Sequence, residues 1–139
     1  MPGFELIGKE EFNEIKHLFD ESRILFRHGF DNERNNIYKV REFEDAFSKK
    51  MNVPFSLGVT SGTSALRVAL AALGIKEGDE VITQSFTFVA TVEAIIESRA
   101  IPIITEIDKT LNMNPEDLEK KITEKTKAII AVHMLGIPS

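Results

Sequence analysis

The sequence predicts an α/β protein, in which a mainly parallel sheet is flanked by helices and preceded by two N-terminal helices. Three observations predict this fold class. Apolar residues recur at helical spacing in two stretches before residue 52. Beyond that point, short apolar segments alternate with helical patterns, which is the order of elements in a parallel sheet. The last segment, 127–132 (KAIIAV), is apolar after its first residue, as expected of a parallel strand covered on both faces.

Residues 1–52 are predicted to form an N-terminal helical segment. Its first helix has apolar residues at near-helical spacing, namely Phe12, Ile15, Phe19 and Ile24. Its second helix is expected over residues 38–51, with one apolar face made of Val40, Phe43, Phe47 and Met51. Residues 26–36 (FRHGFDNERNN) lie between the two helices and are polar with a glycine, so we expect a loop there.

Residues 53–139 are predicted to form the α/β domain. Strands are expected at 55–59, 80–83, 101–107 and 127–132, and helices at 64–73, 86–97 and 115–122. Gly74 is placed to end the first of these helices. Asn114 is suited to cap the last helix, because Pro115 follows it at the first helical position.

Composition limits the possible functions. The 139 residues are 42% hydrophobic and 28% charged, as in a typical globular protein, and the net charge is −5. Lysine and arginine are dispersed, which disfavours binding to nucleic acid or to an anionic membrane surface. The absence of cysteine excludes disulfides and thiolate chemistry, and no motif predicts a metal site. The first residues do not resemble a signal peptide, and no apolar run approaches about 20 residues, so the cytoplasm is the expected location.

The most informative segment is 59–66 (VTSGTSAL), where a predicted strand passes into a helix. A helix N-terminus offers free backbone N–H groups and a partial positive charge. Gly62 lets an anion approach the backbone, while Ser61, Thr63 and Ser64 can add hydroxyl donors. The segment is therefore a candidate phosphate site, although a plain Ser or Thr N-cap with a glycine turn explains the same residues. It matches neither a Walker A loop nor a dinucleotide-binding fingerprint.

Further positions offer weaker signals for chemistry. Phe88 is expected near the start of a helix that follows a strand, where an aromatic side chain can stack on a flat ring, although most such residues belong to a core. His133 follows the last strand and is given no catalytic role. Glu106 and Asp108 form a carboxylate pair at a predicted strand end, which could share acid–base work but is better explained as a solvated strand exit.

A series of segments resembles the DegT/StrS family of sugar aminotransferases, within the fold-type I pyridoxal-phosphate enzymes. The resemblance is carried by 43–44 (FE), 61–66 (SGTSAL), 73–82 (LGIKEGDEVI), 87–91 (TFVAT), 107–108 (ID), 122–129 (ITEKTKAI) and 132–136 (VHMLG). Each segment is weak alone, but the ordered series covers nearly the whole chain. The implied fold of residues 53–139 is an incomplete cofactor-binding large domain of a fold-type I aminotransferase.

The resemblance implies a cofactor and the residues that bind it. Gly62, Thr63 and Ser64 match the turn that holds the phosphate of pyridoxal 5′-phosphate. Phe88 matches the aromatic side chain that stacks on the pyridine ring of the cofactor. Both roles agree with what the residues suggest by themselves.

The resemblance also implies an activity and partners. The expected reaction transfers an amino group from an amino acid to a keto sugar or nucleotide-linked keto sugar, in sugar and cell-surface polysaccharide biosynthesis. Family members generally build each site at a dimer interface, so the full-length form is expected to be a homodimer. Arg27 and Arg34, in the loop at 26–36, are the residues expected to reach the substrate.

The family's Schiff-base lysine, and the aspartate that contacts the pyridine nitrogen, are expected beyond Ser139. No residue of this chain is therefore predicted to be catalytic, and the chain alone is not expected to transaminate. The strands near 80, 101 and 128 are expected to be neighbours, while the strand at 55–59 would lose its partners, which predicts a marginal, swapped or aggregating fold. Two alternatives remain open. One is a truncated, non-catalytic relative that binds a phosphate-bearing ligand or pairs with a full-length enzyme, and the other is an unrelated α/β domain with a nucleotide crevice.

Overall fold

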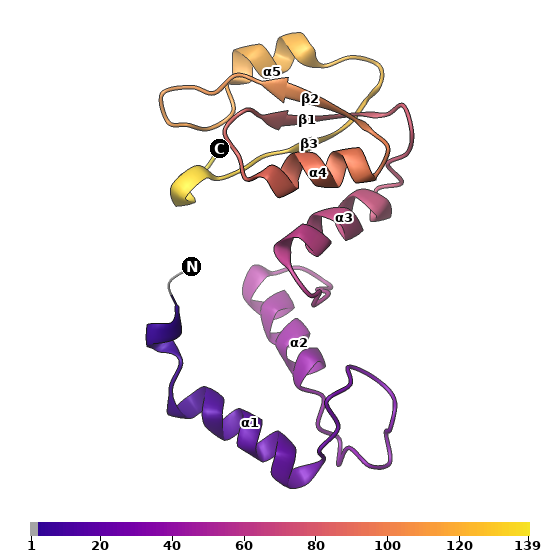
Figure 1. The fold of residues 1–139 in the computed structure, drawn as a ribbon, viewed down its shortest axis with the longest axis vertical. Coiled ribbons are helices and arrows are strands. Elements are labelled where there is room, and N and C mark those ends of the chain that lie inside the picture. Colours follow the sequence, from indigo (N-terminus) through magenta and orange to yellow (C-terminus); the bar gives the residue numbers. More distant parts are fainter. Residues whose placement is uncertain (1–2) are drawn as a thin grey trace. The chain divides into compact units, whose positions relative to one another are not determined.

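The computed structural model describes residues 3–139, and the chain divides into two compact units, Met1–Gly58 and Val59–Ser139. The first unit contains helices and loops, and the second contains a parallel sheet with helices (Figure 1). The α/β fold class predicted from the sequence is therefore confirmed, while the domain boundary predicted after residue 52 stays a prediction. Within residues 3–139, no helix combines the length and apolar character that crossing a lipid bilayer requires.

Two helices dominate the first unit. A 3-10 turn, η1 (Phe4–Leu6), precedes helix α1 (Lys9–Glu21), and helix α2 (Lys39–Met51) follows the loop between them. The Glu11 carboxylate closes the start of α1, because it accepts a hydrogen bond from the Gly8 N–H at 2.7 Å. Helix α2 ends at Asn52, whose left-handed backbone (φ 54°) stops it. Both helices and the loop at 26–36 agree with the prediction.

The buried residues of the first unit are charged. Within residues 3–58, burial is confined to Arg34, which is 2% exposed, and Glu44, which is 9% exposed. The apolar residues of α1 and α2 form the predicted stripes, but they are exposed or half-buried. Polar contacts therefore organise this unit, in place of a hydrophobic core.

Three parallel strands form the sheet of the second unit. They are β1 (Glu80–Gln84), β2 (Ile101–Thr105) and β3 (Thr126–Ile130), arranged in the order β2-β1-β3. The expectation that the strands near 80, 101 and 128 are neighbours is thus confirmed. In β2, Pro102 lies opposite Val81 of β1. Because the adjacent Ile101 N–H donates to the Asp79 carbonyl at 2.8 Å, and successive backbone groups alternate in direction, the nitrogen of Pro102 faces away from β1.

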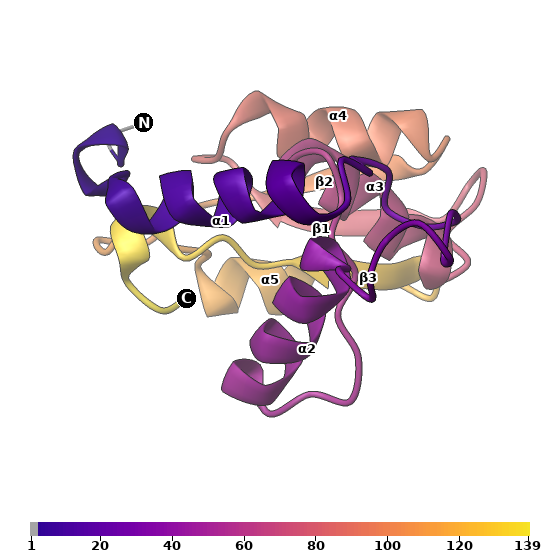
Figure 2. The same ribbon diagram turned by 90° about the horizontal axis from the view of Figure 1, so that it is seen from below.

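Helices cover both faces of this sheet. They are α3 (Gly62–Ala72), α4 (Val89–Glu97) and α5 (Pro115–Lys121), and a 3-10 turn, η2 (Met134–Gly136), follows β3. Figures 1 and 2 both show α4 and α5 on opposite sides of the strands, and α3 packs against α4. The predicted cap of α5 is present, since the Asn114 side chain accepts hydrogen bonds from the N–H groups of Glu116 and Asp117, at 2.9 and 3.4 Å.

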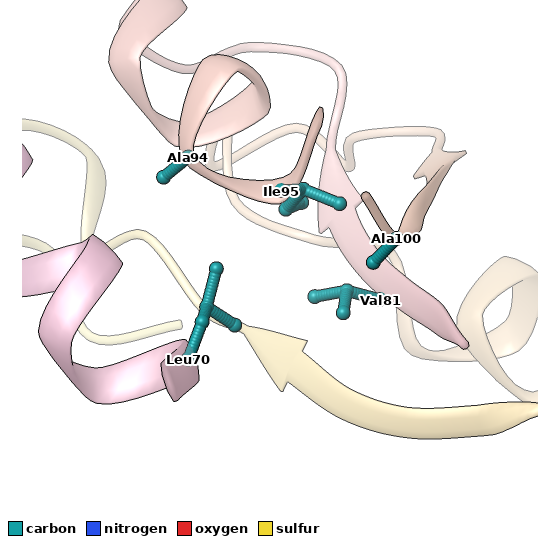
Figure 3. Close-up of a cluster of buried hydrophobic side chains, with 5 residues drawn as sticks. All are labelled: Leu70, Val81, Ala94, Ile95 and Ala100. Carbon is teal, nitrogen blue, oxygen red and sulfur yellow. The ribbon is translucent and has the colours of Figure 1, made fainter. Parts of the chain in front are cut away.

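The hydrophobic core lies between α3, α4 and the sheet. Five buried side chains form it, as Figure 3 shows: Leu70, Val81, Ala94, Ile95 and Ala100. They come from α3, β1, α4 and the turn before β2. Burial of this apolar surface holds the two helices against one face of the sheet.

The strand predicted at 55–59 is absent, so that prediction is wrong. The segment is irregular, and Phe55 is 88% exposed. In this segment a backbone group bonds to a side chain and not to a neighbouring strand: the Gly58 N–H donates to the Glu44 carboxylate at 2.6 Å. An extended segment becomes a strand only when a neighbouring backbone completes the ladder, and within residues 3–139 no backbone pairs with this one. Two smaller differences are that α3 begins at Gly62, before the predicted start, and α4 at Val89, after it.

Candidate functional site

The first turn of α3 carries the predicted phosphate site. Ser61 caps the helix, and its Oγ accepts a hydrogen bond from the Ser64 N–H at 3.0 Å. The first intrahelical bond runs from the Ala65 N–H to the Ser61 carbonyl, at 3.0 Å. Because the opening N–H groups of a helix have no partner within it, the amides of Gly62 and Thr63 are the ones that helix geometry leaves for a ligand. The N-cap interpretation and the phosphate interpretation of this segment are therefore compatible.

Three hydroxyl groups gather beside these amides. The Oγ atom of Ser64 lies 3.1 Å from Oγ1 of Thr60 and 3.0 Å from Oγ of Ser61. A Cβ atom added at Gly62 would meet no atom within 4 Å, so the space on the Cβ side of this residue is open. The first turn of α3 contains no acidic residue, and the helix dipole makes it electropositive. Free amides, hydroxyl donors and open space together fit a phosphate group.

Phe88 occupies the N-cap position of α4, directly after the connection from β1. The Thr91 N–H donates to the Phe88 carbonyl at 3.0 Å, and the hydroxyls of Thr87 and Thr91 lie 2.9 Å apart. The backbone of Phe88 is thus held, while its side chain is 73% exposed. Figure 1 shows the arrowheads of β1 and β2 at the same edge as the start of α4, which is the edge where open α/β sheets bind ligands. An exposed aromatic ring there suits stacking on a flat ligand.

Gln84 is a site-edge residue that the sequence interpretation missed. Its side chain is fully buried at the end of β1, although it is polar. Its amide donates to the carbonyls of Phe86 and Leu111, at 3.0 and 3.1 Å, and its Oε1 accepts from the Val132 N–H at 3.3 Å. The available signal was a glutamine at the end of a short strand (EVITQ), directly before an exposed turn.

Of the three remaining polar candidates, Asp108 and His133 have local hydrogen-bond partners. The Asp108 carboxylate accepts hydrogen bonds from the hydroxyl and the N–H of Thr110, at 2.5 and 2.7 Å, and these bonds lower the pKa of Asp108. Glu106 is exposed beyond the end of β2, in keeping with a solvated strand exit. His133 is also exposed, and its Nδ1 accepts a hydrogen bond from the Ser139 N–H at 2.9 Å.

Arg27 and Arg34 are both engaged within the first unit. The buried guanidinium of Arg34 donates to the carbonyls of Gly29 at 2.5 Å, of Ile37 at 3.5 Å, and of Phe26. It also lies 4.9 Å from the centre of the Tyr38 ring. Arg34 therefore organises the loop around it. Arg27 is paired with Glu44, and the assignment of either arginine to the substrate stays a prediction.

Glu44 anchors the segment that leads out of the first unit. Its Oε1 accepts hydrogen bonds from the Gly58 N–H at 2.6 Å and from the Arg27 guanidinium. The Gly58 N–H contributes most, and Arg27 next, to holding the pKa of Glu44 below its usual value of 4.5, against the opposing effect of burial. Gly58 fits this arrangement closely, because an added Cβ would lie 3.4 Å from Oε1 of Glu44.

Comparison with known proteins supplies the family. Residues 26–139 match the DegT/DnrJ/EryC1/StrS aminotransferase family. The GDP-perosamine synthase of Escherichia coli O157:H7 is 46% identical over 100 residues, which are 71% of this chain and 28% of that protein. The aminotransferase of Psychrobacter cryohalolentis matches with a TM-score of 0.82 and 29% identity, over 95% of this chain and 32% of its own.

A second solved structure was determined with the cofactor. The PLP-form of the putative sugar aminotransferase Spr1654 from Streptococcus pneumoniae has a TM-score of 0.77 and 32% identity, over 91% of this chain and 31% of its own. The chain thus spans under a third of the length of each of these three proteins.

Proposed function

Since the chain belongs to the DegT/DnrJ/EryC1/StrS aminotransferase family, whose cofactor is pyridoxal 5′-phosphate, we propose that it supplies the phosphate-binding part of a sugar aminotransferase. The whole protein would transfer an amino group from an amino acid to a keto sugar or nucleotide-linked keto sugar. The relatedness to GDP-perosamine synthase supports this class of acceptor. We further propose that the whole protein is a homodimer and that it is located in the cytoplasm. The dispersed lysine and arginine residues support the proposal that it binds neither nucleic acid nor membranes.

The observation that carries the proposal is the start of α3. The amides of Gly62 and Thr63 and the Ser64 hydroxyl bind the phosphate, while the absence of acid in this turn avoids repulsion. Phe88 covers one face of the pyridine ring from the start of α4. The bound cofactor supplies an electron sink for amino transfer. The residues of this chain hold and orient it.

Substrate contact is proposed for the loop at 26–36. Arg27 is the better candidate there, because its side chain is 41% exposed although paired with Glu44. Arg34 is buried on three carbonyl groups, so it acts by shaping the loop. We propose that no lysine of this chain forms the imine with the cofactor, since none lies in the matching context of the family.

The test uses 4′-deoxypyridoxine 5′-phosphate, which keeps the ring and phosphate of the cofactor but has no aldehyde to react with surface lysines. Calorimetry with the chain is expected to show binding that is tighter than for inorganic phosphate. Gly62→Asp places a negative charge in open space and is expected to weaken binding by more than about tenfold. The matched control is Ala69→Asp, at an exposed position of the same helix, which should change the affinity by less than about twofold.

Two outcomes count against the proposal. If the ring-bearing probe binds the Gly62→Asp variant as tightly as the unaltered chain, the phosphate does not bind at the start of α3. Equal affinity for the ring-bearing probe and for inorganic phosphate would favour the alternative, a non-catalytic binder of phosphate-bearing ligands. A separate experiment treats the chain with pyridoxal phosphate and borohydride, and selective labelling of one lysine at a stoichiometric amount of cofactor would contradict the proposal that no lysine of this chain forms the imine.

A further inference from the structure

Gln84 connects three segments at one edge of the sheet. Its two amide N–H groups donate to the carbonyls of Phe86 and Leu111, and its oxygen accepts from the Val132 N–H. The orientation of the amide is determined by its surroundings, because the reverse placement would set its oxygen against two carbonyls. All of its hydrogen-bonding groups are used inside the protein, as burial requires.

The three partners of Gln84 belong to the connections that leave the carboxyl ends of the three strands. Phe86 follows β1, Leu111 follows β2, and Val132 follows β3. A single buried side chain therefore ties together the loops at the edge where open α/β sheets bind ligands. Its neighbours in the sheet bond differently, since Thr83 donates to the Ile130 carbonyl and Thr105 to the Thr83 carbonyl, both between adjacent strands.

The turn held by Gln84 carries Phe88. The Phe86 carbonyl is fixed two residues before Phe88, and the Thr91 N–H fixes the carbonyl of Phe88 itself at 3.0 Å. Between these anchors the ring projects with most of its surface exposed. Because the Phe88 ring makes few packing contacts, its position depends on the backbone that carries it. The hydrogen bond from Gln84 to the Phe86 carbonyl therefore helps to determine where the ring lies.

We propose that Gln84 is a positioning residue for the cofactor ring: by holding the 85–88 turn against the loops after β2 and β3, it presents Phe88 in the orientation that stacks on the pyridine. This rests on the proposed function. Gln84 itself does not touch the cofactor. Its loss should therefore affect the ring-dependent part of binding and spare the phosphate-dependent part at α3.

The test compares two probes on the full chain: 4′-deoxypyridoxine 5′-phosphate and inorganic phosphate. Gln84→Met keeps the side-chain volume and removes all three hydrogen bonds. It is expected to weaken binding of the ring-bearing probe by about tenfold and binding of inorganic phosphate by less than about twofold. Thr83→Val is the matched control, because it removes a buried hydrogen bond from the same strand but not from the turn, and it should leave the ratio of the two affinities unchanged.

A double-mutant cycle separates positioning from a general loss of stability. Phe88→Leu alters an exposed ring and should weaken only the ring-bearing probe. In that background, Gln84→Met should cost less than about twofold, because its effect passes through the ring. Folding of each variant is checked by circular dichroism. If Gln84→Met does not fold, Gln84→Glu, which keeps the acceptor for the Val132 N–H, is expected to give the same ring-specific weakening.

The outcomes distinguish this inference from the proposed function. Equal weakening of both probes by Gln84→Met, or an undiminished effect in the Phe88→Leu background, would overturn the positioning role while the phosphate site stands. If the unaltered chain binds neither probe, the proposed function fails and this inference fails with it.

Discussion

The two units of this chain differ in the kind of side chain that they bury. In residues 59–139, buried apolar side chains of α3, α4 and the sheet form a common core. In residues 3–58, the buried side chains are the charged Arg34 and Glu44, and each is satisfied by backbone groups. Apolar burial is proportional to area and insensitive to direction, whereas hydrogen bonds to carbonyls fix one geometry.

The apolar core is expected to give residues 59–139 most of their stability, whereas the buried polar contacts give residues 3–58 a specific loop shape. The net contribution of hydrogen bonds to stability is modest, because the unfolded chain makes them with water. We therefore expect residues 3–58 to open locally at a lower free energy than the sheet does. Three substitutions, each with a control, test this difference between the two units.

The largest effect is expected in the core of the second unit. Ile95 is fully buried on α4, and Ile95→Ala removes apolar burial and leaves a cavity. We expect it to lower the free energy of unfolding by about 2–5 kcal/mol, measured by urea denaturation followed by circular dichroism. Ile96→Ala is the control, since its side chain is 56% exposed on the same helix, and it should cost under about 0.5 kcal/mol. Equal costs at the two positions would show that this core does not control stability.

A smaller, local effect is expected at Arg34. Arg34→Met keeps an unbranched, flexible stem but removes the hydrogen bonds of the guanidinium to three carbonyls of the loop. We expect the opening free energy of residues 26–37 to fall by about 2 kcal/mol, measured by amide hydrogen exchange, with protection in β1 unchanged. Arg41→Met is the comparison, because that guanidinium also lies over the Tyr38 ring, at 4.3 Å, but it is exposed. If Arg34→Met lowers the hydrogen-exchange protection of β1 as much as that of the loop, residues 3–58 do not open independently of the sheet.

The smallest effect is the pH dependence that Glu44 confers. Its pKa is lowered in the folded state by the Gly58 N–H and Arg27, so its contribution to stability is full above the unfolded value near 4.5. That contribution is lost as the pH falls through the lower folded value. Glu44→Gln should flatten the decline in thermal stability between about pH 5 and 3, while Asp45→Asn, at an exposed position of the same helix, should retain it. If Glu44→Gln leaves the pH dependence of thermal stability unchanged, Glu44 does not contribute to it.

Features set by neighbours in the sequence were predictable. Asn114 followed by Pro115 specified the start of α5, because a cap and a first helical residue act within a few positions. Likewise Ser61 and Gly62 marked the turn into α3, even though the helix begins slightly earlier than its apolar pattern indicated. That the three strands are neighbours followed from the family resemblance, which encodes contacts between distant segments, whereas their order β2-β1-β3 came from the structure.

Features set by distant partners were not predictable from composition or spacing. Residues 55–59 have the composition of a strand, but pairing decides that state, and Glu44 takes the Gly58 N–H instead. The enclosure of Arg34 by backbone carbonyls could not be predicted either, because it is set by the path of the loop. Gln84 was overlooked because its three partners lie in three separate connections.

Because of Pro102, the two edge strands of the sheet, β2 and β3, differ in the backbone donors that they offer to a further strand. Its nitrogen lies on the side of β2 that no other strand of residues 3–139 occupies, and it bears no hydrogen, so a backbone approaching there would meet a gap in the row of donors. Strand β3 (TKAII) contains no proline, and its unpaired side keeps every amide hydrogen. A further strand, from this protein or from a second copy, would therefore find an uninterrupted row of amide donors beside β3 and an interrupted row beside β2.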